Sequence, residues 1–122
     1  MNSKLFLSLA ILFTFFVSTG YTQTQMPPKM VPAAENYPGG KEAMYAFINQ
    51  KAIYPPVAKR NRLQGECIVG FTINEDGTVS NFKVVKNIGG GAGEEAVRIA
   101  KLLKFNAIGY KLETTIPIIF KL

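Results

Sequence analysis

The strongest constraint on the fold is a β-hairpin signal at residues 66–86. In its first half the side chains alternate between two faces, and a period of two is typical of a strand. One face of this strand carries Cys67, Val69, Phe71 and Ile73. Asp76-Gly77 then lies between two apolar runs, which predicts a tight reversal. The second strand is expected at residues 78–86, with a bulge or twist near Lys83 because its apolar residues break strict alternation.

Helical periodicity is predicted on both sides of the hairpin. Residues 41–50 place apolar side chains at helical spacing, and residues 56–62 are expected to form a short helix that begins at the proline pair. Residues 94–104 carry an apolar stripe, and Glu94 precedes Arg98 in the favourable i,i+4 order. The glycine run before this helix is predicted to be a flexible turn, because it lacks the G-K-[ST] of a phosphate-binding loop.

The last predicted strand, residues 112–122, contains Pro117 within an alternating apolar pattern. Proline has no N–H to donate, so this strand belongs at a sheet edge, with the missing donor facing outward. Strands and helices in this order predict an α+β fold in two layers. We expect a three-stranded antiparallel sheet of order 2-1-3, with two main helices packed on one face.

Two interpretations of this edge strand stay open. An exposed edge has unpaired backbone groups, and Pro117 and Lys121 blunt it only in part. Either the strand accepts an extended peptide by backbone pairing, or its isoleucines are core residues of an edge that faces water. The candidate partner-binding residues are Thr115, Ile116, Pro117, Ile118, Ile119 and Phe120.

Residues 1–20 have the layout of a secretory signal, in which Lys4 precedes an apolar run that ends at Val17. This run is shorter than the roughly 20 residues that cross a bilayer, so cleavage is favoured over retention as an N-terminal membrane anchor. Residues 21–38 contain several prolines and are expected to form an extended tether. Residues 39–122 then form one folded domain outside the cytoplasm.

The side chains that most enzymes use near neutral pH are scarce. The chain has no His, and its only cysteine, Cys67, lies on the inward face of the first predicted strand. The acidic pairs Glu75-Asp76 and Glu94-Glu95 are explained by turn and helix-terminus chemistry. We therefore expect no enzyme activity, no metal and no cofactor.

The net charge of +6 suits either an anionic partner or plain solubility. Lys59, Arg60 and Arg62 belong to a basic surface that is solvated charge by default. One function class left open by these residues is a passive envelope-associated module that binds cell-wall polymer or a membrane surface. No nucleic-acid partner is expected.

A set of spaced motifs runs through the second half of the chain. The motifs are YPPVA, then QG, the strand CIVGFTI, the turn NEDGTV, the helix EEAVRIAKLLKF and the terminal IPIIF. Over residues 39–122 they resemble, in one unbroken order, the C-terminal domain of TonB-type energy transducers. The resemblance implies that the structural motif residues are Tyr54, Pro55, Ala58, Gln64, Gly65, Asp76 and Gly77.

The resemblance also implies a function. It is that of a periplasmic domain that binds an extended peptide of an outer-membrane TonB-dependent transporter, or of another envelope protein, by strand addition in energy-coupled transmembrane transport. An inner-membrane proton-motive-force complex is a further partner if the N-terminal segment stays as an anchor. Exposed edge strands also allow a dimer. The chain departs from the family pattern at Asn106, where proline is common, and it is a short variant without the long Pro-rich rod.

Overall fold

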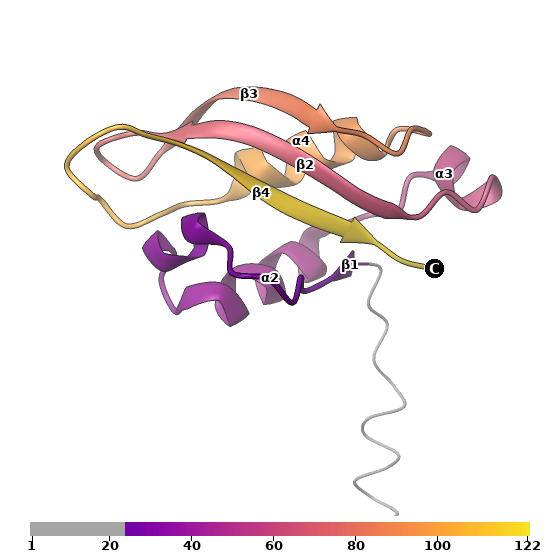
Figure 1. Cartoon of the computed structure of the whole chain (residues 1–122), viewed down its shortest axis with the longest axis horizontal. Helices are drawn as coiled ribbons and strands as arrows, with labels where there is room; N and C mark the ends of the chain where they lie inside the picture. The colour runs from indigo at the N-terminus through magenta and orange to yellow at the C-terminus, as the bar shows by residue number, and fades with distance from the viewer. Residues whose placement is uncertain (1–23) are drawn as a thin grey trace, which may run out of the picture.

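The computed structural model describes residues 24–122, so the predicted signal peptide or anchor at residues 1–20 lies outside the described residues. In chain order the described elements are β1 (Thr24–Gln25), the 3-10 helix η1 (Pro32–Asn36), α2 (Gly40–Lys51), α3 (Pro56–Arg60), β2 (Gly65–Ile73), β3 (Val79–Lys86), α4 (Ala92–Leu102) and β4 (Leu112–Phe120). Figure 1 shows β2, β3 and β4 side by side in one layer, with α2 below them. None of the helices within the described residues is long and apolar enough to span a membrane.

The strand pairs are antiparallel, and the sheet order is β1-β4-β2-β3. The α+β class and the antiparallel pairing are as predicted, but the sheet has four strands and not three, and its order differs from the predicted 2-1-3 by an added outer strand. The strands that the sequence predicts keep their expected neighbours, and the difference is β1, which lies beyond β4. A strand as short as Thr24–Gln25 cannot show an alternating pattern, so the sequence carries no signal for it.

One hydrophobic core joins the inner face of the sheet to the helices. The residues that alternation placed on one face of β2 are all buried, namely Cys67, Val69, Phe71 and Ile73. The main helices α2 and α4 contribute to the same core Met44, Ile48, Ala96 and Ile99. Burial of these apolar side chains is the main stabilising term for a chain of this size, which has no disulfide within the described residues.

The β2–β3 turn forms where the Asp-Gly pair predicts it. The Asn74 N–H donates to the Thr78 carbonyl at 2.7 Å, and the Gly77 N–H donates to the Asn74 carbonyl at 2.9 Å. The β3 strand then shifts register against β2 at two places, and Asn81 adopts a left-handed φ of 56°. The predicted bulge near Lys83 is thus confirmed.

The glycine run before α4 is a close-packed turn rather than a flexible one. A Cβ added to Gly90 would lie 2.8 Å from the backbone of Ala58 in α3, and Gly90 itself has a φ of 64°. Only glycine combines a left-handed conformation with such a close backbone approach. The run therefore fixes α3 against the start of α4.

Part of residues 24–38 packs against the domain, with buried positions at Thr24, at Pro27 and within residues 31–34, which differs from the extended tether expected for residues 21–38. The 3-10 helix η1 buries Ala33 and Ala34, and Val31 before it is also buried. The Asn36 carbonyl accepts a 2.8 Å hydrogen bond from the N–H of Asn106, in the connection before β4. Small apolar residues between the prolines find space in the core, and their burial outweighs the tendency of proline to keep a segment extended.

Candidate functional site

The candidate site is the outer edge of β4. Along its inner edge this strand pairs with β2 over residues 112–120. Along its outer edge it pairs only with β1, at Ile119 and Phe120. Over residues 112–118 the outer edge therefore has no strand beside it within the described chain.

Pro117 shows which backbone groups of β4 face outward. It lies opposite Ile68 of β2 but has no N–H to donate, and its carbonyl accepts a 2.7 Å hydrogen bond from the Tyr45 hydroxyl of α2. Backbone groups alternate in direction along an antiparallel strand, so Thr115 shares the orientation of Pro117. β4 is not the outermost strand, which corrects its predicted place at the sheet edge, because β1 lies beyond it. Pro117 itself lies where the outer side of β4 has no strand beside it, and Thr115 presents both an N–H and a C=O there.

The short strand β1 closes the C-terminal end of the same edge. Thr24 lies opposite Phe120, and Gln25 lies opposite Ile119. The Thr24 side chain is buried, and its hydroxyl donates a 3.1 Å hydrogen bond to the side-chain oxygen of Asn49 in α2. The Thr24 N–H donates to the same oxygen at 3.5 Å. A segment of the chain itself therefore already acts as an added strand at this edge.

A hollow of about 260 Å³ lies between β1 and α2. Its lining residues are Thr24, Met26, Glu42, Tyr45, Ala46 and Asn49. Tyr45 also binds the Pro117 carbonyl, so the hollow adjoins the open part of the edge. Burial raises the pKa of Tyr45, and the charge of Glu66 adds to this effect. The hydroxyl thus stays protonated and remains a donor at neutral pH.

The candidate partner-binding residues divide between the two faces of the sheet. Buried in the core are the side chains of Ile116, Ile118 and Phe120. Exposed or half-buried are those of Thr115, Pro117 and Ile119. The buried side chains of Ile116, Ile118 and Phe120 are therefore core residues. The side chains of Thr115, Pro117 and Ile119 and the outward-facing backbone groups of β4 are accessible to a partner.

Three motif residues gather at the end of the sheet where β2 begins and β4 ends. The Tyr54 ring packs edge-on against Phe120 with centroids 5.5 Å apart, and its hydroxyl donates to the Leu63 carbonyl. The Gln64 side-chain oxygen accepts a 3.1 Å hydrogen bond from the N–H of Leu122. Gly65, which follows, is paired with Phe120. These contacts hold the C-terminal end of β4 in place.

Pro55 and Ala58 support this end from α3. Pro55 is the N-cap residue that precedes α3, and its Cβ lies 3.3 Å from the position that a Cβ on Gly91 would take. Ala58 is completely buried. Both residues are small enough to let the glycine turn before α4 approach α3, so their role is packing.

Asp76 and Gly77 lie in the turn that joins β2 to β3. One carboxylate oxygen of Asp76 accepts hydrogen bonds from the N–H and the hydroxyl of Thr78, at 3.1 and 2.6 Å, and these bonds lower the pKa of Asp76. The Gly77 carbonyl accepts a 3.0 Å hydrogen bond from the Phe105 N–H. The turn is therefore held both internally and by the segment that follows α4.

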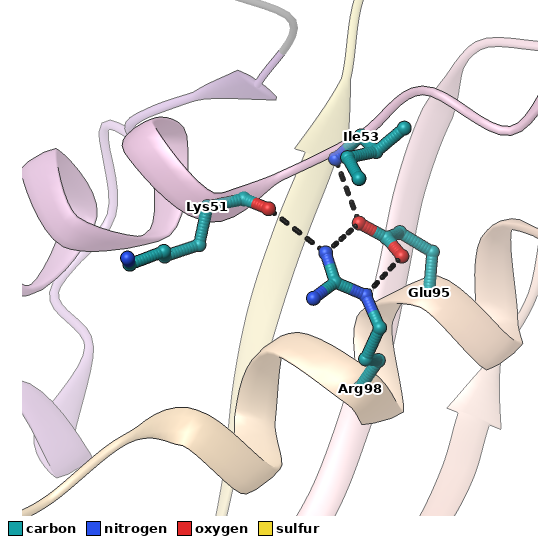
Figure 2. Close-up of polar contacts among 4 residues, drawn as sticks. All are labelled: Lys51, Ile53, Glu95 and Arg98. Atoms are coloured by element: carbon teal, nitrogen blue, oxygen red, sulfur yellow. Dashed lines mark hydrogen bonds and ion pairs between the residues drawn. The ribbon is translucent and has the colours of Figure 1, made fainter.

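A polar cluster links α4 to the end of α2 (Figure 2). Arg98 donates to the two carboxylate oxygens of Glu95 at 2.7 and 2.6 Å, and to the Lys51 carbonyl at 2.8 Å. The same carboxylate accepts a 2.7 Å hydrogen bond from the Ile53 N–H. Arg98 thus pairs with Glu95, and the predicted pairing with Glu94 is wrong. The reason is that Glu95 faces the backbone groups at which α2 ends.

No sequence pattern assigns a role to Thr24, Tyr45 or Asn49. A tyrosine beside the apolar stripe of a helix is a signal that a buried hydroxyl needs a hydrogen-bond partner. Nothing in the local sequence names that partner, because Pro117 lies in a different element. The polar contacts that border the edge thus became visible only in the structure.

The site offers backbone pairing groups and not a catalytic constellation. Within residues 24–122 no group of three or more side chains could hold a metal ion. Burial raises the pKa of the Cys67 thiol, which keeps it neutral and poorly nucleophilic. What the arrangement can do chemically is to pair main-chain N–H and C=O groups with another extended segment.

Comparison with known proteins gives one family. A family model described as "Gram-negative bacterial TonB protein C-terminal" matches residues 50–122. Protein TonB of Helicobacter pylori strain J99 is 48% identical over 40 residues, and so is Protein TonB of strain 26695. This segment is 33% of the chain and 14% of each relative, so the similarity spans a small part of the relatives' length.

Two solved structures are similar in fold. The solution structure of Helicobacter pylori TonB-CTD (residues 194-285) is 31% identical, with a TM-score of 0.57, and the match covers 66% of this chain and 90% of that one. The longer TonB-CTD (residues 179-285) is 32% identical, with a TM-score of 0.54 and coverage of 79% and 97%.

Proposed function

Because this chain belongs to the Gram-negative bacterial TonB protein C-terminal family, we propose that it binds an extended peptide of an outer-membrane transporter. The peptide adds as a strand to the open outer edge of β4, in energy-coupled transmembrane transport. The domain acts in the periplasm, where another envelope protein is a second candidate source of the peptide. If residues 1–20 are retained as an anchor, the chain also contacts an inner-membrane proton-motive-force complex.

The observation that carries this proposal is the asymmetry of β4. Its inner edge is paired throughout, whereas its outer edge carries only the short strand β1 from the chain itself. Edges of this kind bind extended peptides through main-chain hydrogen bonds. The opposite edge strand, β3, is less suited because it is bulged and exposes Lys83 and Lys86.

Family membership does not favour the alternative of a passive module that uses Lys59, Arg60 and Arg62. Ionic strength separates the two functions experimentally. Contacts between exposed charges weaken as salt is added, whereas main-chain pairing depends little on salt. Peptide binding that persists at high salt therefore supports strand addition.

The test is a titration of the isotopically labelled full chain, in mild detergent, with synthetic peptides from the plug ends of outer-membrane transporters. We expect amide shift changes to concentrate at Glu113, Thr115 and their neighbours in β4. Thr115→Pro removes an outward-facing N–H without touching the ladder to β2, as Pro117 already does two positions on. It should weaken peptide binding about tenfold, because one hydrogen bond to the peptide is lost and the geometry of the adjacent hydrogen bond is disturbed.

Thr115→Val is the matched control, because it changes the side chain and keeps the N–H. We expect it to bind the peptides as the unmodified chain does. Shift changes confined to β3, or equal affinity of Thr115→Pro and Thr115→Val, would contradict strand addition at β4. So would the absence of shift changes with every peptide.

A further inference from the structure

The short strand β1 lies in the path of a guest strand that follows the whole of β4. It pairs with Ile119 and Phe120 on the same outer edge. The Thr24 N–H points to Asn49 and therefore away from β4. By alternation, the N–H and the C=O of Gln25 face Ile119. A single residue of β1 thus supplies the main-chain hydrogen bonds between the two strands.

The hold of β1 on the edge is small. The Gln25 side chain is exposed, and the side chains of Met26 and Met30 after it are 44% and 77% exposed. Pro27 between these methionines is buried, and the chain is buried again at Val31, which is 3% exposed. β1 is therefore a short strand on a segment that is buried at Thr24 and Pro27, exposed at the residues between and after them, and anchored in the core at Val31. Such a segment can leave the edge and return to it while the core stays folded.

We propose that β1 is an internal competitor for the peptide-binding edge. A guest peptide that pairs with the whole of β4 displaces Thr24–Gln25, and β1 covers the edge again when the guest leaves. This inference rests on the proposed function, since it concerns the regulation of the same site. While β1 is paired, it also shortens the open edge that other exposed strands could pair with.

The anchor at Val31 sets the strength of the competition. It keeps β1 at a high local concentration beside β4, so the competition does not depend on protein concentration. The guest replaces the hydrogen bonds between Gln25 and Ile119 with its own, and the contact of Thr24 with Asn49 is lost when β1 leaves. The loss of these β1 contacts corresponds to about a tenfold weaker guest affinity than that of an edge without β1.

Gln25→Pro tests the competition by releasing β1. It removes the N–H that faces Ile119 and leaves β4 itself unchanged, and the exposed position avoids a loss of core packing. We expect faster hydrogen exchange at the Ile119 amide and about tenfold tighter binding of the plug-end peptides in the full chain. Gln25→Ala keeps the N–H and should match the unmodified chain in both measurements.

A disulfide between Gln25→Cys and Ile119→Cys tests the state in which β1 is held permanently on β4. Residues directly opposite in an antiparallel pair have Cα atoms about 4.5–5.5 Å apart, which suits a disulfide. Cys67 is buried and does not compete for the new thiols. We expect the oxidised protein to bind the plug-end peptides more weakly than the reduced protein does, because only residues 112–118 of the outer edge then stay open to the guest.

The outcomes separate this inference from the proposed function. If the oxidised, reduced and Gln25→Pro forms all bind the peptides with equal affinity, β1 is no competitor and the inference is overturned, while strand addition stands. Weaker binding by Gln25→Pro overturns it as well. If no form binds any peptide, including the one with the released edge, the proposed function fails, and the inference fails with it.

Discussion

Gly77→Ala tests the contact that holds the β2–β3 turn against the segment after α4. Gly77 has a φ of 89°, a conformation that costs an alanine about 1–2 kcal/mol. An added Cβ would lie 2.1 Å from the Phe105 carbonyl oxygen, so the backbone of Phe105 has to move. That movement breaks the 3.0 Å hydrogen bond from the Phe105 N–H, which contributes about 1 kcal/mol. It also shifts the buried Phe105 ring, which lies 5.8 Å from the ring of Phe71.

We expect Gly77→Ala to lower the free energy of unfolding by about 3–4 kcal/mol, since the lost packing of Phe105 adds to the strain and the broken hydrogen bond. Gly109→Ala is the matched control. Gly109 has a φ of 80°, but no atom lies within 4 Å of its Cβ position. It should therefore lose only the strain energy of about 1–2 kcal/mol. Urea unfolding followed by circular dichroism measures both values.

The difference between these two variants is the informative quantity. Both gain the same methyl group in a left-handed conformation, so a difference of about 2 kcal/mol isolates the collision with Phe105. Equal losses in Gly77→Ala and Gly109→Ala would refute the close approach of the turn to the segment after α4. They would also remove the physical reason for glycine at this motif position beyond its backbone conformation.

Two further predictions concern Tyr45 and Asp76. Tyr45→Phe removes the donor to the Pro117 carbonyl and should lower the free energy of unfolding by about 1 kcal/mol in the same urea assay. Tyr110→Phe, at an exposed tyrosine, is the control, and equal effects would count against the hydrogen bond. Hydrogen bonds from Thr78 lower the pKa of Asp76, so its stabilising effect is present above the ordinary carboxyl value and is lost as pH falls through the lower folded value. Asp76→Asn should therefore flatten the decline of the urea midpoint below about pH 4, and an unchanged slope would argue against this assignment.

Elements with their own repeat were predictable from the sequence. Alternation identified β2 and its buried face, the Asp-Gly pair identified the turn, and the irregular pattern of β3 identified its bulge. The missing N–H of Pro117 predicted the open side of the last strand. Each of these features depends on residues within one element, so its physical cause is local in the sequence.

Contacts between distant segments were not predictable in the same way. The pairing of β1 with β4, the hydrogen bond from Tyr45 to Pro117 and the choice of Glu95 by Arg98 all join separate elements. The packing of residues 31–38 also depends on space left between helix and sheet. None of these contacts produces a periodic sequence pattern in the residues that make it.

The sequence by itself thus determined the hairpin, the main helices, the α+β class and the strand with an open side, because hydrophobic periodicity is a local record of which face is buried. Only the tertiary structure decided that a segment near the start of the chain covers one end of that open side. Edge pairing uses backbone groups that every residue except proline carries in full, so the identity of the paired segment depends on which backbone the fold brings within reach.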